Sequence, residues 1–148
     1  MRKMESKSKQ VFIRIPAEAE YMDVVRLTLY GIASRVGFGY EEIEDMKVAV
    51  SEACNNAILH AYKEGEPGMI DLEFTQTADG LTIQVKDEGA SFDYEEKIGR
   101  AKPLHNKELD EVELGGLGLY LMQVLMDDLK VNSGQGTEVV LTKYLKQG

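Results

Sequence analysis

Two pairs of short alternating segments constrain the fold of this chain more than any other feature. In residues 70–75 and 81–86 apolar side chains alternate with polar ones, and the TADG sequence between them is typical of a hairpin turn. A second pair, residues 129–133 and 137–145, flanks a Gly-Gln-Gly turn. Strands joined by tight turns pair antiparallel. The sequence therefore predicts a mostly antiparallel sheet built around two hairpins.

Helical periodicity occupies three other segments. Apolar residues recur every three or four positions in residues 18–36, and glycines follow. Residues 40–62 begin with a cluster of glutamates, which the positive end of a helix dipole favours. A third helix is expected over residues 115–128, after an opening pair of glycines. One more alternating segment, residues 10–15, precedes a proline and predicts a strand.

The order of these elements predicts the fold class. The predicted order is a strand, two helices, a hairpin, a long loop, a helix and a second hairpin. This order favours an α+β fold. We expect a two-layer sandwich, with a mixed, mostly antiparallel sheet and helices on one face. The length fits a single domain, residues 1–148. Residues 1–9 are polar and expected to fray, and the weakly periodic loop 90–114 is long enough to suggest a function.

Composition narrows the classes of function. The formal net charge is −9, and an acidic surface repels phosphate backbones, so direct nucleic-acid binding is not expected. A single cysteine, Cys54, excludes an internal disulfide and a cysteine-based zinc site. No apolar run reaches the roughly 20 residues of a membrane helix, and the N-terminus lacks the apolar core of a signal peptide. We therefore expect a cytoplasmic protein.

The polar residues of the second helix form the first candidate site. Glu52 and Asn56 are four residues apart and share one helix face, with Asn55 nearby and His60 further along. A carboxylate and a carboxamide on one face could supply a general base and a ligand for a hard cation. The same spacing is also common on solvated helices. His60 fits a packed histidine better than a phosphate carrier.

Three glycine-containing segments are further candidates. Asp87 and Gly89 follow an alternating strand, where a plain turn is the alternative interpretation. Gly116 and Gly118 open a helix, whose backbone N–H groups could bind an anion, although a glycine hinge would look the same. Thr137 follows the Gly-Gln-Gly turn, which needs no function of its own.

The order of these segments is more specific than any one of them. The chain contains, in order, a helical E-x-x-x-N, a strand-end D-x-G, a long loop, a G-x-G at a helix start and a final G-T. This order resembles that of the Bergerat-type ATP-binding fold of gyrase, heat-shock chaperones, MutL and histidine kinases. Three longer segments are similar to the small bacterial serine-protein kinases that act as anti-sigma factors: VRLTLYG (25–31), EEIEDMKVAVSEACNNAILHAYKE (41–64) and GGLGLYLMQVLMDDLKV (115–131). The likeness is greatest to the anti-sigma-B factors of the general stress response and covers nearly the whole chain.

The resemblance implies ATP and Mg²⁺ as cofactors and a role for each matching residue. Glu52 matches the general base, and Asn56 matches the asparagine that holds Mg²⁺. Asp87 matches the carboxylate that accepts the adenine amino group. Gly89 matches the glycine beside the adenine ring, and Gly116 and Gly118 match the glycines that contact the phosphates. Thr137 matches the threonine that supports the adenine site. Residues 90–114 match the ATP lid.

This sequence departs from the family pattern at two places. Ser91 replaces the second glycine of the usual D-x-G-x-G. Leu114 stands where a relative carries a basic residue. Three cations within residues 90–114 are candidate partners of the γ-phosphate: Arg100, Lys102 and Lys107.

The function that the resemblance implies is a partner-switching regulator. Such a protein binds and inhibits a sigma factor, here one of the sigma-B type, and phosphorylates a serine on the anti-anti-sigma protein that antagonises it. Family members act as homodimers, and Arg26 matches an arginine that relatives use for partner contact. The alternative is an ATP-dependent protein-binding module without kinase activity. Because a module that only senses nucleotide needs no base, Glu52 favours the kinase.

Overall fold

A computed structural model describes residues 9–62, 67–89 and 116–146 of the chain. Its sheet contains β1 (Lys9–Pro16), β2 (Met69–Gln76), β3 (Gly80–Asp87), β4 (Asp128–Gly134) and β5 (Gly136–Tyr144). The strand order is β1-β2-β3-β5-β4, and every neighbouring pair is antiparallel. The expected two-layer fold is thus confirmed, and the described strands contain no parallel pair.

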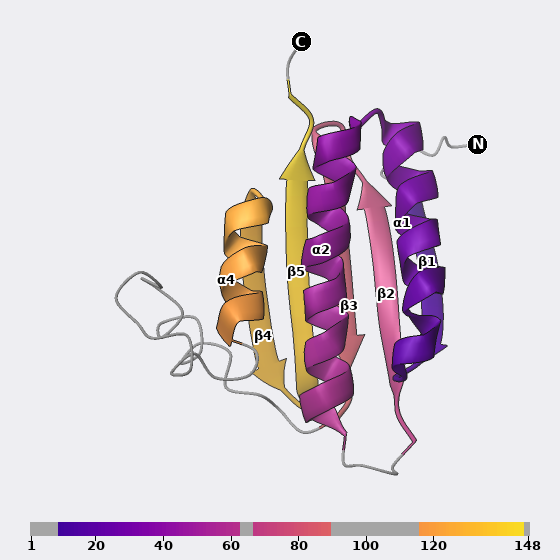
Figure 1. Ribbon diagram of the computed structural model, residues 1–148, viewed down its shortest axis with the longest axis vertical. Coiled ribbons are helices and arrows are strands. Elements are labelled where there is room, and N and C mark those ends of the chain that lie inside the picture. The colour runs from indigo at the N-terminus through magenta and orange to yellow at the C-terminus, as the bar shows by residue number, and fades with distance from the viewer. Residues whose placement is uncertain (1–8, 63–66, 90–115, 147–148) are drawn as a thin grey trace, which may run out of the picture.

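All the long helices cover one face of this sheet (Figure 1). They are α1 (Met22–Val36), α2 (Tyr40–Asn56) and α4 (Gly116–Leu125). A short 3-10 turn, η1 (Ala19–Tyr21), precedes α1, so the regular helix begins later than residue 18, where the periodicity placed it. Helix α1 is capped by Gly37, which has a positive φ of 115° and donates its N–H to the carbonyl of Ala33.

The helix predicted over residues 40–62 divides into two parts. Regular α-helix ends at Asn56, and η2 (Ala57–Ala61) continues it as a wider π-helix. Periodicity does not separate the two, because a π-turn adds only one residue to the repeat. The predicted helix is thus confirmed over residues 40–61, with a π-helix as its last turn, and Tyr62 leaves it with an extended backbone. No helix in the described ranges is long and apolar enough to span a bilayer.

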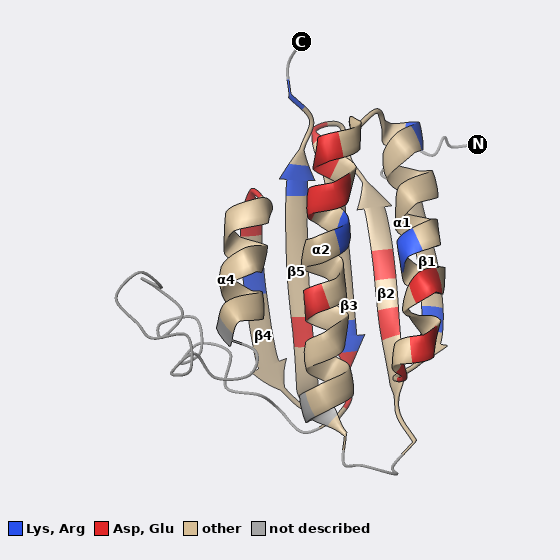
Figure 2. Ribbon diagram, viewed as in Figure 1, with Lys and Arg blue, Asp and Glu red and all other residues tan. Residues whose placement is uncertain are grey.

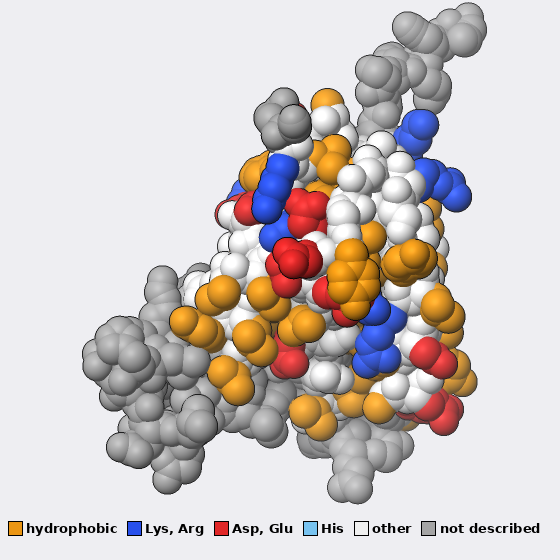
Figure 3. All heavy atoms as spheres, turned by 45° about the horizontal axis from the view of Figure 1, so that its top comes forward, with side chains coloured by type: hydrophobic (Ala, Val, Ile, Leu, Met, Phe, Trp, Pro, Cys, Tyr) orange, Lys and Arg blue, Asp and Glu red, His pale blue; other side chains and the backbone are white. Residues whose placement is uncertain are grey.

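The hydrophobic core lies between the helices and the sheet. Helix side chains such as Leu29, Met46 and Val50 pack on strand side chains such as Leu72 and Ile83, and all are essentially inaccessible to solvent. This packing, more than helix propensity, holds α1 and α2 in place. The helices are amphipathic, and Figure 3 shows hydrophobic side chains interspersed with charged ones on the exterior of the helical side.

The opposite face of the sheet is mostly polar, with Phe12 of β1 as an exposed apolar side chain on it. Arg14 forms an ion pair of 3.1 Å (Nε to Oδ1) with Asp71 on the neighbouring strand. Gln84 and Asn132 both donate hydrogen bonds to Glu138, which lies between them on β5. Figure 2 shows the acidic residues of β2 as well as those along α2 and around the start of α1. The sheet therefore buries one face and hydrates the other, as the alternation predicted.

Candidate active site

The C-terminal end of α2 carries the first part of the site. Asn56 is buried, with 4% of its surface exposed, and its Nδ2 has no hydrogen-bond partner among the described residues. A buried amide nitrogen without a partner costs free energy, so proteins seldom leave one without a role. Asn55 is less buried than Asn56. Of the two asparagines, only Asn56 has this unsatisfied group.

Glu52 lies one turn before Asn56 on the same helix. Its side chain is half-buried, and desolvation raises the pKa of its carboxyl. The carboxylate lies directly against Gly118 in α4: a Cβ atom at that glycine would be 2.5 Å from Glu52 Oε1. The absence of a side chain at residue 118 therefore lets α4 pack beside the predicted base.

The end of β3 carries the second part of the site. Asp87 is buried, with 5% exposed, and its Oδ1 accepts the N–H of Gly89 at 3.0 Å. Burial raises the pKa of the Asp87 carboxyl, and backbone hydrogen bonds from Gly89 and Thr137 partly oppose the rise. The Asp87 carboxylate is thus fixed in place by two backbone donors.

Thr137 faces Asp87 across the sheet, because the two are paired in the register of β3 and β5. The Thr137 hydroxyl is buried and, like the amide of Asn56, has no hydrogen-bond partner among the described residues. Gly136 has a φ of 89°, and a Cβ atom there would overlap the Asp87 carbonyl. A glycine at that position is therefore required for this close approach.

Burial distinguishes three polar side chains of this site. Within the described chain, the buried polar or charged residues are Asn56, Asp87 and Thr137, and the sequence marked all three. They lie at the same end of the molecule, where α2 ends, β3 ends and β5 begins (Figure 1). Helix α2 packs against both strands. Two unsatisfied groups and a desolvated carboxylate at one end of a sandwich are suited to a polar ligand.

The other predicted residues have different positions. Gly116 opens α4 at the same end of the fold, as expected. Arg26 is exposed on α1, which lies across α2 from α4, so it is not part of this site. The proposed lid, residues 90–114, lies outside the described residues, and so do three cations and two other predicted positions: Arg100, Lys102, Lys107, Ser91 and Leu114. The side chain of His60 also lies outside them.

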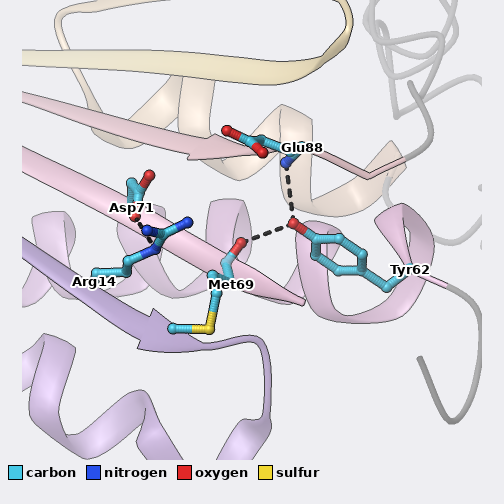
Figure 4. A network of polar contacts seen from close by, with 5 residues as sticks. All are labelled: Arg14, Tyr62, Met69, Asp71 and Glu88. Carbon is cyan, nitrogen blue, oxygen red and sulfur yellow. Dashed lines mark hydrogen bonds and ion pairs between the residues drawn. The ribbon is translucent and has the colours of Figure 1, made fainter. Parts of the chain in front are cut away.

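Sequence reasoning missed one residue of the site. Tyr62 directly follows the π-turn and touches the segment between Asp87 and Gly89 (Figure 4). Its only signal in the sequence was an aromatic residue shortly after the E-x-x-x-N motif. No three His, Cys, Asp or Glu side chains gather as a metal cluster in the described part of the chain.

Comparison with known proteins agrees with this geometry. The family described as "Histidine kinase-like ATPase domain" matches residues 15–143. The chain is 46% identical over 145 residues to the serine-protein kinase RsbW of Bacillus subtilis, which covers 96% of this chain and 89% of the relative. It is 49% identical over 140 residues to RsbW of Bacillus pumilus, covering 91% of this chain and 85% of that one.

A solved structure has the same fold. The RsbU and RsbW domains of Rv1364c from Mycobacterium tuberculosis match with a TM-score of 0.68 at 21% identity, covering 95% of this chain and 33% of that one. The family resemblance drawn from the sequence is confirmed by the match to the family and by the identity to the RsbW relatives. With its buried Asn56, Asp87 and Thr137 at one end of the sandwich, the chain belongs to the histidine kinase-like ATPase family and, within it, to the RsbW serine-protein kinases.

Proposed function

We propose that the polar end of the sandwich binds Mg·ATP. The observation that carries this proposal is the set of buried polar side chains, two of which have atoms without partners: Asn56, Asp87 and Thr137. Asp87 is an acceptor suited to the adenine amino group, Gly89 leaves room beside the ring, and Thr137 would support the same edge. The backbone N–H groups at Gly116 and Gly118 suit phosphates at a helix N-terminus.

The amide oxygen of Asn56 is a suitable ligand for Mg²⁺, a hard cation that prefers oxygen. One asparagine cannot fill an octahedral shell, so phosphate oxygens and water would complete it. The residues present thus fit a cation that enters with the nucleotide.

Glu52 is the proposed general base of a protein serine kinase. When bound, Mg·ATP would supply its γ-phosphoryl group to the serine hydroxyl oxygen, and the bond between that group and the β-phosphate would break to leave ADP. Glu52 takes the proton from that hydroxyl as the new bond forms. Desolvation raises the pKa of Glu52, which brings its basicity closer to that needed near neutral pH. The contact with Gly118 holds the carboxylate beside the helix that is proposed to bind phosphates.

The proposed biological role is that of an anti-sigma factor. The substrate is a serine of an anti-anti-sigma protein, and the chain also binds and inhibits a sigma factor of the sigma-B type in the cytoplasm during the stress response. We further propose a homodimer, with the exposed Arg26 of α1 contacting a partner. Support comes from relatives at 46% and 49% identity that are named serine-protein kinases. Residues 90–114 are proposed as the ATP lid.

A label-transfer experiment tests this function against the alternative of an ATP-dependent binding module. The protein is mixed with labelled ATP, Mg²⁺ and candidate anti-anti-sigma proteins, and label is sought on serine. Glu52→Gln should bind ATP but transfer label at least about 10²-fold more slowly. Glu41→Gln, an exposed position on the same helix, is the matched control and should transfer normally. Normal ATP binding without any transfer by the wild type would favour the binding module.

A further inference from the structure

Tyr62 stands at the junction between the two halves of the proposed nucleotide site. It is the first residue after the π-turn that continues the helix of Glu52 and Asn56. Its backbone is extended there, and its side chain points to the ends of β2 and β3 (Figure 4). The residue is therefore attached to the helical half of the site while its phenol reaches the strand half.

The Tyr62 hydroxyl makes two hydrogen bonds to backbone groups. It accepts the N–H of Glu88 at 3.0 Å and donates to the carbonyl oxygen of Met69 at 2.8 Å. The register of β2 and β3 ends at the pair Ile70–Asp87, and Met69 and Glu88 are the next residues on the two strands. One oxygen atom thus joins the two strands just beyond their last paired residues.

The Tyr62 ring is held in place by close packing. A Cβ atom on Gly68 would be 2.5 Å from the ring carbons, so the ring lies directly on the backbone of that glycine. A ring fixed on one side and a hydroxyl fixed on the other leave the phenol little freedom. The hydroxyl can therefore hold the peptide of Glu88 at a defined position.

That peptide lies at the centre of the proposed adenine site. Glu88 is flanked by Asp87, whose carboxylate is the proposed acceptor, and by Gly89, whose N–H donates to that carboxylate at 3.0 Å. A shift of the Glu88 peptide would move both neighbours. The position of the Asp87 carboxylate thus depends on a hydrogen bond that comes from the end of the Asn56 helix.

We propose that Tyr62 is a positioning residue that orients the adenine-recognising turn, Asp87 to Gly89, relative to the helix that carries Glu52 and Asn56. This inference rests on the proposed function, because it assigns Tyr62 to the same nucleotide site. Its role is in base selectivity. Adenine presents an amino donor where guanine presents a carbonyl oxygen, so a correctly placed carboxylate accepts from the first and repels the second.

The test is the affinity of the whole chain for Mg·ATP and Mg·GTP, measured by isothermal titration. Tyr62→Phe keeps the ring on Gly68 and removes only the hydroxyl. We expect the dissociation constant for ATP to rise about fivefold, the scale of one lost hydrogen bond, while that for GTP changes little. Tyr40→Phe, at the exposed start of the same helix, is the matched control and should change neither constant.

A purely structural role for Tyr62 gives a different result. A general loss of stability would lower the melting temperature and weaken the binding of ATP and GTP alike, so the ratio of their affinities would not change. An unchanged ratio in a folded Tyr62→Phe protein would overturn the proposal. If that variant does not fold, Gly68→Ala, which displaces the ring but keeps the hydroxyl, takes its place, and the same ratio decides.

A double-mutant cycle with Asp87→Asn tests the route of the effect. If Tyr62 acts through the carboxylate, Tyr62→Phe should weaken ATP binding far less in the Asp87→Asn background than in the wild type. Equal losses in both backgrounds would overturn the proposal. Failure of the wild-type chain to bind ATP would instead contradict the proposed function, so the two failures are distinguishable.

Discussion

Replacement of Thr137 by valine should stabilise the protein without nucleotide and weaken its binding of nucleotide. Valine has nearly the same shape as threonine and keeps the backbone N–H that Thr137 donates to Asp87. Only the hydroxyl is lost, and that hydroxyl is buried without a partner among the described residues. The substitution therefore separates the free energy of the ligand-free fold from the free energy of binding.

The size of each effect follows from the burial of the hydroxyl. A buried polar group without a hydrogen bond costs about 1–3 kcal/mol, and its removal should recover at least about 1 kcal/mol. For a chain of this size that corresponds to a rise of about 3 °C in melting temperature. Loss of one hydrogen bond to the bound nucleotide should raise the dissociation constant for ATP about fivefold.

Thermal melts and isothermal titration with Mg·ATP measure the two quantities. Thr142→Val is the matched control on the same strand, because the Thr142 hydroxyl lies 3.4 Å from that of Thr82 on the polar face of the sheet. It should give neither the gain in stability nor the loss of affinity. If Thr137→Val lowers the melting temperature and leaves ATP affinity unchanged, the hydroxyl supports the fold and the assignment to the nucleotide site is wrong.

Three other predictions concern the remaining site residues. Asn56→Ala should abolish the Mg²⁺-dependent part of ATP affinity in titrations with and without the cation, while an unchanged Mg²⁺ effect would point to Asn55. Gly118→Ala should displace the Glu52 carboxylate and slow label transfer about 10²-fold, the scale of a 1 Å misplacement, whereas Gly31→Ala, which has open space around it, should not. Because burial raises the pKa of Asp87 above its ordinary 3.8, its contribution to the free energy of unfolding should rise as pH falls from neutral towards that value. Urea unfolding at several pH values should show a weaker pH dependence for Asp87→Asn.

Much of the fold could be predicted because its signals are local. Alternation over residues 70–75 and 81–86 and the turn between them are contained in a short stretch, and the Thr77 hydroxyl accepts the N–H groups of Asp79 and Gly80 in that turn. The pairing of β1 with β2 could not be predicted in this way. These strands are separated in the chain by α1 and α2, and no periodicity records which strand lies next to which.

The candidate site was predictable where it follows short motifs. Glu52 and Asn56 share a helix face by spacing alone, but their roles came from the family resemblance and not from geometry. Two features depend on contacts between distant segments and have no corresponding pattern in the sequence. They are the packing of Glu52 on Gly118 and the hydrogen bond between Tyr62 and Glu88. A tyrosine after a helix has many uses, and only the three-dimensional arrangement distinguishes this one.

The register of Asp87 opposite Thr137 has a consequence for folding and for variation in chain length. Each hairpin can form locally, but this pair closes a loop of 49 residues, 88–136, which includes residues 90–115. The proposed adenine side of the site therefore exists only after the two hairpins have docked, so we expect it to form late in folding. Because the entropy of closing a loop grows only logarithmically, doubling its length would cost about 0.6 kcal/mol. The segment between the hairpins can thus lengthen or shorten during evolution while the residues on either side keep their register.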